Sequence, residues 1–168
     1  MDFKETLYKR ASIRKFLDKD IPIEVLEELV HYGLRAPSAK NSRPWEFYVI
    51  TNKEKMEDIK HVYTHASYNC AAMILVCGNK DRFLSGEGEN FWIEDTSAAV
   101  ENILLGAVSL GLGGIWIGTY PIKERMDGVK KELELGDNIV PMALIELGYP
   151  SETNPRNIDE ENKIYYVK

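Results

Sequence analysis

Residues 36–45 read Ala36-Pro37-Ser38-Ala39-Lys40-Asn41-Ser42-Arg43-Pro44-Trp45, and they connect two elements of different kinds. An amphipathic stretch over residues 23–34 precedes this loop, and an apolar run over residues 47–50 follows it. A proline disfavours the α conformation in the residue before it, so Pro37 ends a helix and Pro44 keeps the chain extended into a strand. The polar residues between the prolines form either a binding loop on two rigid supports or an ordinary solvated connection.

Length and composition indicate an ordinary globular chain, and we predict a single domain over residues 1–168. Hydrophobic residues make up 44% of the chain, which is enough to bury a core without disulfides. The net charge of −6 disfavours nucleic acid as a partner. No apolar run reaches the length of a membrane span, and no hydrophobic signal core begins the chain. We therefore expect a cytoplasmic protein with neither a nucleic-acid nor a membrane partner.

Cysteine and histidine spacing predicts no metal site. Cys70 and Cys77 enclose an apolar run and lack the spacing of a metal or redox pair, so we expect buried thiols in a reducing compartment. His61 and His65 stand four residues apart, as metal ligands on a helix do, but no third ligand follows in a fitting pattern.

Apolar periodicity predicts a chain of mixed helices and strands. Helices are expected over residues 2–9, 23–34, 53–63 and 122–135, the last capped by Gly136, and strands over residues 46–51, 70–77, 140–147 and 164–167. A further helix, with Asp95-Thr96-Ser97 as its capping residues, should run to Leu110 and end at Gly111. It is apolar on every face, which predicts a central helix or one covered by a partner chain. The terminal strand is expected to reach a distant sheet edge, including that of a partner.

Two short motifs are candidates for ligand binding. In an extended Arg10-Ala11-Ser12-Ile13-Arg14, side chains alternate, so Arg10, Ser12 and Arg14 share one side and suit a phosphate group. The alternative is a solvated charged strand. Gly113 and Gly114 precede another strand and let backbone N–H groups approach a flat ligand, or they form a glycine-rich turn without a ligand. No catalytic carboxylate pair or nucleophile stands out, which favours chemistry carried by a cofactor.

Taken in order, these motifs resemble the nitroreductase family of FMN-dependent oxidoreductases. The resemblance rests on Arg-Ala-Ser-Ile-Arg, then Ala-Pro-Ser-x-x-Asn-x-x-Pro-Trp, then Gly-Leu-Gly-Gly-x-Trp-Ile-Gly and Leu-Gly-Tyr-Pro, and it covers essentially the whole chain. It implies an α+β fold, in which helices flank a central, mostly antiparallel sheet, and an intertwined homodimer with FMN at the subunit interface.

The resemblance also implies roles for particular residues. Arg10 and Ser12 hold the FMN phosphate, with Arg156 as a second phosphate contact, and Arg14 lies near the pyrimidine edge of the flavin. Pro37, Ser38 and Asn41 come from the partner subunit, and backbone N–H groups around Gly113 and Gly114 face flavin N5. Ala11 and Arg43 depart from the family pattern, which usually has arginine and glutamine there.

The implied activity is electron transfer from NADH or NADPH, through the flavin, to a small-molecule acceptor such as a nitroaromatic, a quinone or free flavin. Two alternatives stay open: a specialised flavoenzyme of the same fold, such as a reductive dehalogenase, and a flavin-binding redox carrier without turnover. The segment over residues 79–92 is short, which suggests an open site, and it is either a lid or a plain loop.

Overall fold

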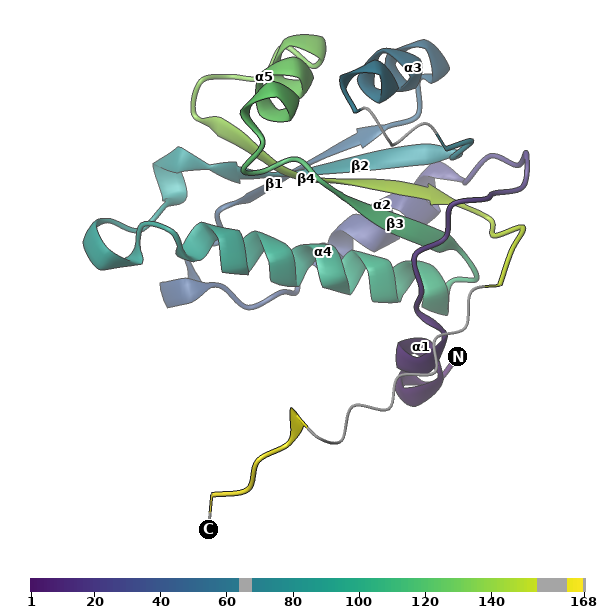
Figure 1. Ribbon diagram of the computed structural model, residues 1–168, viewed down its shortest axis with the longest axis horizontal. Coiled ribbons are helices and arrows are strands. Elements are labelled where there is room, and N and C mark those ends of the chain that lie inside the picture. The colour runs from purple at the N-terminus through teal and green to yellow at the C-terminus, as the bar shows by residue number, and fades with distance from the viewer. Residues whose placement is uncertain (64–67, 154–162, 168) are drawn as a thin grey trace.

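A computed structural model describes residues 1–63, 68–153 and 163–167 of the chain. Its centre is a sheet of β1 (Trp45–Ile50), β2 (Ala72–Asn79), β4 (Ile139–Gly148) and β3 (Gly113–Gly118), in that spatial order (Figure 1). All three neighbouring pairs are antiparallel. The α+β fold with an antiparallel sheet flanked by helices is therefore confirmed. β3 forms one edge of this sheet, and its position there leaves one side of the strand available to other parts of the chain.

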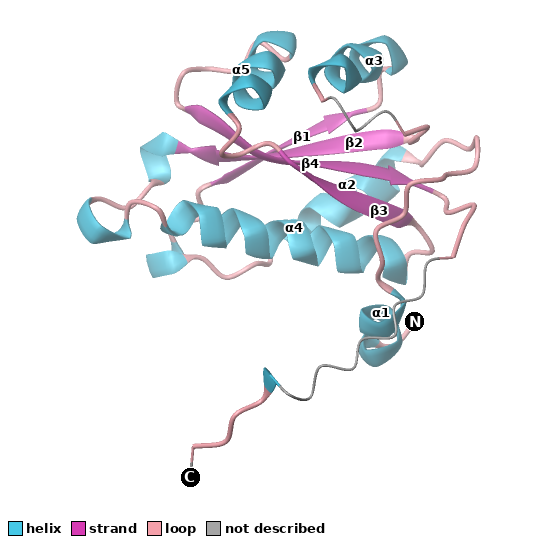
Figure 2. Ribbon diagram, in the orientation of Figure 1, coloured by secondary structure: helices cyan, strands magenta, loops and turns pink. Residues whose placement is uncertain are grey.

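Helices cover both faces of the sheet (Figure 2). α2 (Ile23–Gly33) and α4 (Phe91–Ser109) pack together on one face, and α3 (Lys53–Val62) and α5 (Lys123–Glu132) pack together on the other. α1 (Phe3–Lys9) contacts α4, and short 3₁₀ turns occupy Ala39–Asn41, Lys80–Arg82 and Gly86–Gly88.

The core consists of two apolar clusters separated by the sheet. The central strands β2 and β4 are buried on both faces, so they read as nearly continuous apolar runs. Ile74 and Ile145 belong to the cluster beneath α2 and α4, whereas Met73 and Leu144 belong to the cluster beneath α3 and α5. Cys70 and Cys77 are free and buried in the second cluster, as expected for structural thiols.

α4 is the longest helix described, and its start differs from the prediction. It begins at Phe91 after Asn90, so the prediction that Asp95-Thr96-Ser97 caps it is wrong. Asp95 and Thr96 are buried inside the helix. The end agrees with the prediction: Gly111 has a φ of 76°, and the Leu112 N–H donates to the Ala107 carbonyl over 2.8 Å. This is a Schellman ending, which glycine favours.

Two further predictions fail at the ends of elements. α5 ends at Glu132, and Glu134 (φ 51°), not Gly136, takes the left-handed position after it. Residues 164–167 form no strand in the single chain; they run away from the sheet, with Tyr165 86% exposed (Figure 1). His65, the second member of the histidine pair, lies outside the described residues.

Candidate functional site

The segment that follows α1 lies along the outer edge of β3. Ser12 forms an isolated parallel bridge with Gly114, and the Ile13 N–H donates to the Gly114 carbonyl over 3.1 Å. Ala11 and Ile13 are buried, whereas Arg14 is exposed and Arg10 and Ser12 are half-buried. The predicted alternation is thus confirmed: pairing with the sheet edge turns the two arginines and the serine to the side away from the core.

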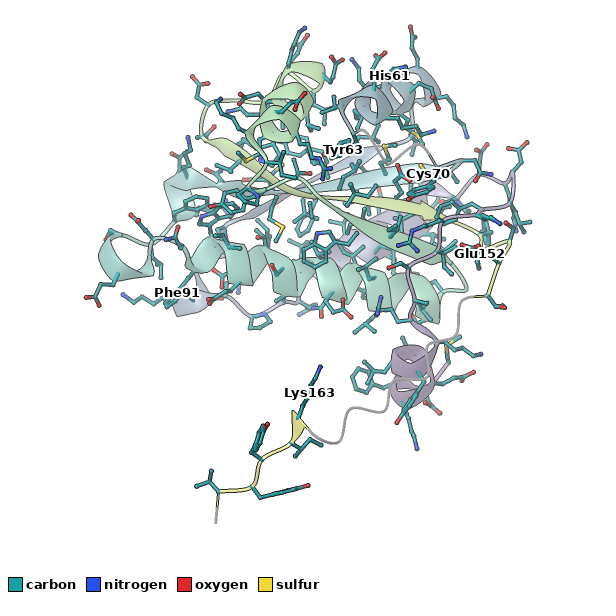
Figure 3. The ribbon with its side chains drawn as sticks, viewed as in Figure 1. His61, Tyr63, Cys70, Phe91, Glu152 and Lys163 are labelled. Atoms are coloured by element: carbon teal, nitrogen blue, oxygen red, sulfur yellow. The ribbon has the colours of Figure 1, made fainter. Side chains whose placement is uncertain are left out.

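Carboxylates hold this segment in place without burying its charges. The Nε of Arg10 lies 3.5 Å from the Oε1 of Glu101 on α4. The backbone N–H of Arg14 donates to Glu152 Oε1 over 2.9 Å, and Figure 3 places Glu152 beside this segment. Because the Arg10–Glu101 pair is partly exposed and its separation is long, it is weak, and an anion of higher charge can compete for the guanidinium.

A cavity of about 220 Å³ opens on the α3 and α5 side of β3. Among the described residues that line it there is no carboxylate, while two guanidinium groups and two phenols are present; the lining consists of Arg14, Tyr63, Tyr68, Ile115, Trp116, Ile117, Gly118 and Arg125. Such a lining, with two guanidinium groups and two phenols, is cationic and suits an anionic ligand that can also accept hydrogen bonds. Figure 3 shows Tyr63 between α3 and α5 on this face.

Tyr63 is a neutral hydrogen-bonding group of this cavity. Its hydroxyl lies 2.7 Å from Thr119 Oγ1, and both residues are buried. Burial raises the pKa of Tyr63 to about 12, which outweighs the opposite effects of the Thr119 hydrogen bond and the Arg125 charge. The phenol therefore keeps its proton at neutral pH and stays available as a donor or acceptor.

Two glycines of β3 are packed closely against other parts of the chain. A Cβ on Gly113 would lie 2.8 Å from Ile13 Cγ1, and a Cβ on Gly114 would lie 3.1 Å from Leu104 Cδ2. The space these glycines leave is filled by protein, so they set how closely the residues 10–14 segment and α4 approach the strand. A Cβ on Gly118 would meet nothing within 4 Å, and Gly118 lines the cavity.

Gly118 is thus the glycine that leaves room for a ligand, and sequence reasoning missed it. The available signal was its position at the end of the strand, after Trp116 and Ile117, where a neighbouring element no longer covers the backbone. The denser pair Gly113-Gly114 at the start of the strand is the more conspicuous pattern in the sequence.

The Ala36–Trp45 loop is held in place by the buried carboxylate of Asp95. The Ala39 N–H donates to Asp95 Oδ1 over 2.8 Å, and the Arg43 N–H donates to Ser38 Oγ over 3.0 Å. Lys40, Asn41 and Arg43 have positive φ values of 50°, 55° and 48°. The Arg43 guanidinium also donates from Nε to Asn41 Oδ1 over 2.9 Å, so this unusual residue helps to shape the loop.

The two groups of predicted site residues lie near opposite ends of α4 in one chain. Asp95, which holds the loop, is in the second turn of α4, whereas Gly114 follows its C-terminus. At 1.5 Å per residue, the helix separates them by roughly 20 Å. The structure therefore brings Arg10, Ser12 and Arg14 together with β3, but it does not bring Pro37, Ser38 or Asn41 to them. Arg156 lies outside the described residues.

Other kinds of site are not found in the described part of the chain. Within residues 1–63, 68–153 and 163–167, no group of three or more histidine, cysteine or carboxylate side chains is arranged to hold a metal ion. None of the helices described there is both long and apolar enough to cross a membrane.

Comparisons with known proteins agree with this architecture. The family model for the nitroreductase family matches residues 7–67 and 60–149. A Methanothermobacter thermautotrophicus protein with the provisional name NADH dehydrogenase/NAD(P)H nitroreductase is 35% identical, over 100% of this chain and 88% of its own length. A Parabacteroides distasonis crystal structure of the same provisional name has a TM-score of 0.90 at 34% identity and covers 98% of this chain and 97% of its own.

A further solved structure carries a cofactor in its name. The FMN-dependent nitroreductase of Clostridium difficile R20291 has a TM-score of 0.86 at 28% identity, with 97% of this chain and 98% of its own covered. The family match covers most of the chain, and the first relative exceeds 30% identity along the full length of this chain. The chain therefore belongs to the nitroreductase family.

Proposed function

We propose that this protein is an FMN-dependent oxidoreductase that takes electrons from NADH or NADPH and passes them to a small-molecule acceptor such as a nitroaromatic, a quinone or a free flavin. The observation that carries the proposal is the β3 edge, where Arg10, Ser12 and Arg14 alternate with buried residues along the strand and Arg14 lines a cavity with a second guanidinium. Family membership and the FMN-dependent relative support the same conclusion.

The residues present fit FMN. Arg10 and Ser12 would bind the phosphate, because a guanidinium fork and a hydroxyl both donate to phosphate oxygens. The segment runs parallel to β3, and Arg14 and Gly118 line the cavity beside it, so these residues would receive the ring of a flavin whose phosphate lies at Arg10 and Ser12. Gly113 and Gly114 contribute by letting Ile13 approach the strand. We retain Arg156 as a proposed second phosphate contact.

When bound, the flavin supplies the capacity to accept a hydride at N5 and to release electrons to an acceptor. The protein's own groups would bind the flavin and fix its orientation. The fixed charge of Arg14 favours the negative charge that develops on the pyrimidine ring, because a preorganised cation need not reorient during the reaction. Ile115 and Ile117 of β3 also line the cavity and would contact the ring.

We further propose a homodimer in which Pro37, Ser38 and Asn41 of one subunit complete the site held by β3 of the other. Two observations support this arrangement. In one chain, Asp95, which holds the loop, and Gly114 lie near opposite ends of α4, roughly 20 Å apart along the helix, so the loop and the start of β3 are held at different places. The apolar face of α1 is also uncovered, with Phe3 72% and Tyr8 75% exposed, and cavities of about 400 and 410 Å³ flank that helix.

Exposed apolar surface of this kind marks a protein interface. The apolar residues 164–167 offer a further segment that a partner can cover.

Two buried thiols are consistent with a reducing, cytoplasmic setting.

A spectroscopic experiment tests the proposal. Purified protein incubated with FMN and passed over a desalting column should retain the flavin absorbance, and NADH or NADPH added without oxygen should bleach it. Protein that never retains flavin would contradict the proposal. Protein that retains flavin but is bleached by neither nicotinamide would instead be a redox carrier. Acceptors added after bleaching, including nitroaromatics, quinones and an aryl halide, then separate a general reductase from a reductive dehalogenase.

A further inference from the structure

Arg125, on the first turns of α5, is held rigidly at the end of β3. Its Nη1 donates to the Gly118 carbonyl over 2.7 Å, and its guanidinium carbon lies 5.6 Å from the centroid of the Tyr63 ring. That distance is within the range of a cation–π interaction. Neither residue carries a sequence signal, because Tyr63 follows α3 and Arg125 lies on α5, and the two meet only in the folded chain.

The partners of Arg125 are themselves fixed. Tyr63 is buried and its hydroxyl is paired with the buried Thr119, so the aromatic ring cannot turn away. Gly118 belongs to a paired strand, which fixes the direction of its carbonyl. A guanidinium with one hydrogen bond and one ring contact of this kind loses little further freedom when a ligand binds, so its charge is preorganised.

The charge of Arg125 is also uncompensated. The ion pairs found within the described residues include Arg10 with Glu101, but none of them includes Arg125. Arg125 and Arg14 line the same cavity, where no described lining residue is acidic. A negative charge that forms in this cavity therefore meets two cations, which approach it from the β3 edge and from α5.

We propose that Arg125 is a second cation at the flavin ring, where it stabilises the negative charge gained on reduction. This inference rests on the proposed function. The reaction moves a hydride, with its two electrons, from the nicotinamide to the flavin, so the nicotinamide leaves oxidised and the flavin gains the negative charge. Arg14 and Arg125 hold that charge together, and the reduced form is bound more tightly than the oxidised form.

The test measures the midpoint potential of the bound flavin by equilibration with a redox dye, in the full-length protein loaded with FMN. The variants are Arg125→Gln, which removes the charge, and Arg125→Lys, which keeps it. Lys131→Gln is the matched control, because it removes one positive charge from an exposed position on the same helix. Arg125→Met serves as a second uncharged variant if Arg125→Gln melts at a lower temperature than the parent.

Removal of the charge should weaken reduced-flavin binding about tenfold more than oxidised-flavin binding, which lowers the potential by about 30 mV for a two-electron couple. Arg125→Lys should keep most of the potential, and Lys131→Gln all of it. An unchanged potential in Arg125→Gln or Arg125→Met overturns the inference, as does an equal fall in Arg125→Lys. Failure of the proposed function is distinguishable, since the parent protein itself would then retain no flavin or would be bleached by neither NADH nor NADPH.

Discussion

The β3 edge and the Ala36–Trp45 loop are both candidate parts of one site, but they are held in different ways. At the β3 edge, backbone pairing with the sheet fixes Ser12 against Gly114. In the loop, a side chain from the middle of the chain, Asp95, fixes the backbone of Ala39, and three residues nearby take left-handed conformations. The alternation of a segment paired with a strand can be read from its local sequence, whereas the contact between the loop and the distant Asp95 carboxylate cannot.

The largest expected effect concerns β4, the strand that pairs with β3. Glu146 pairs with Ile115 across the strands, is fully buried, and neither of its carboxyl oxygens has a hydrogen-bond partner among the described residues. Burial raises its pKa from 4.5 to about 8; the Lys60 charge opposes this rise and the Glu57 charge adds to it. The folded state therefore holds a proton that the unfolded state releases near pH 4.5.

Stability should fall as pH rises from about 4.5 to about 8, by at most about 5 kcal/mol at roughly 1.4 kcal/mol per pKa unit. Glu146→Gln should abolish this dependence of the unfolding free energy on pH. The variant should therefore unfold at a higher urea concentration than the parent at pH 9, and at about the same concentration at pH 5. Urea denaturation at both pH values checks this, with the exposed Glu124→Gln as control. A parent whose stability is flat between pH 5 and 9 would show that Glu146 is not buried as a neutral acid.

The next effect tests the β3 edge as a phosphate site. Arg10→Ala should weaken FMN binding by roughly 1.5–3 kcal/mol, or about 10-fold to 150-fold, the range for hydrogen bonds to charged groups. Fluorescence titration of FMN measures it. Lys9→Ala is the control, since Lys9 is exposed and pairs with Glu5. Equal FMN affinity in Arg10→Ala and the parent would show that Arg10 does not bind the phosphate.

A pair of glycine substitutions separates packing from binding along β3. Gly113→Ala places a Cβ 2.8 Å from Ile13 Cγ1 and should cost about 1–3 kcal/mol of folding stability, because the residues 10–14 segment must move. Gly118→Ala meets no atom within 4 Å, so it should leave the melting temperature nearly unchanged and weaken FMN binding. Thermal melts and FMN titration distinguish the two. The reverse pattern would restore Gly113 as the glycine that faces the ligand.

The smallest effect tests the loop. Asp95→Ala leaves the Ala39 N–H without its acceptor, at a cost of about 1–2 kcal/mol in a partly buried setting. Since the loop is proposed to complete the partner's site, FMN affinity should fall together with dimerisation, measured by light scattering during the titration. Glu94→Ala, exposed on the same turn, is the control. A lower melting temperature with unchanged FMN affinity would make the loop purely structural.

Sequence patterns predicted what repeats along the chain and missed what depends on distant contacts. The period-two alternation of Arg10, Ser12 and Arg14 and the apolar runs of the central strands are local signals, and the structure confirms both. Asp95 resembles a helix cap because its preferred role, accepting a backbone N–H, is the same in both settings; only the folded chain shows that the donor is Ala39.

The end of α5 and the cavity were missed for related reasons. Glycine is the usual residue at a left-handed helix end, which favoured Gly136, yet Glu134 occupies that position. The cavity joins residues of the segment that follows α3 with residues of β3 and α5, and no spacing within any one of these segments predicts it.

The length of α4 has a genetic consequence. Because this helix keeps the two half-sites apart, a variant damaged at Arg10 and a variant damaged at Asp95 carry their defects in different halves. In a mixed dimer of the proposed kind, one site receives both defects and the other receives neither. Two inactive alleles expressed together should therefore restore activity that neither provides alone, whereas a single damaged allele should still leave one intact site for each intact copy it pairs with.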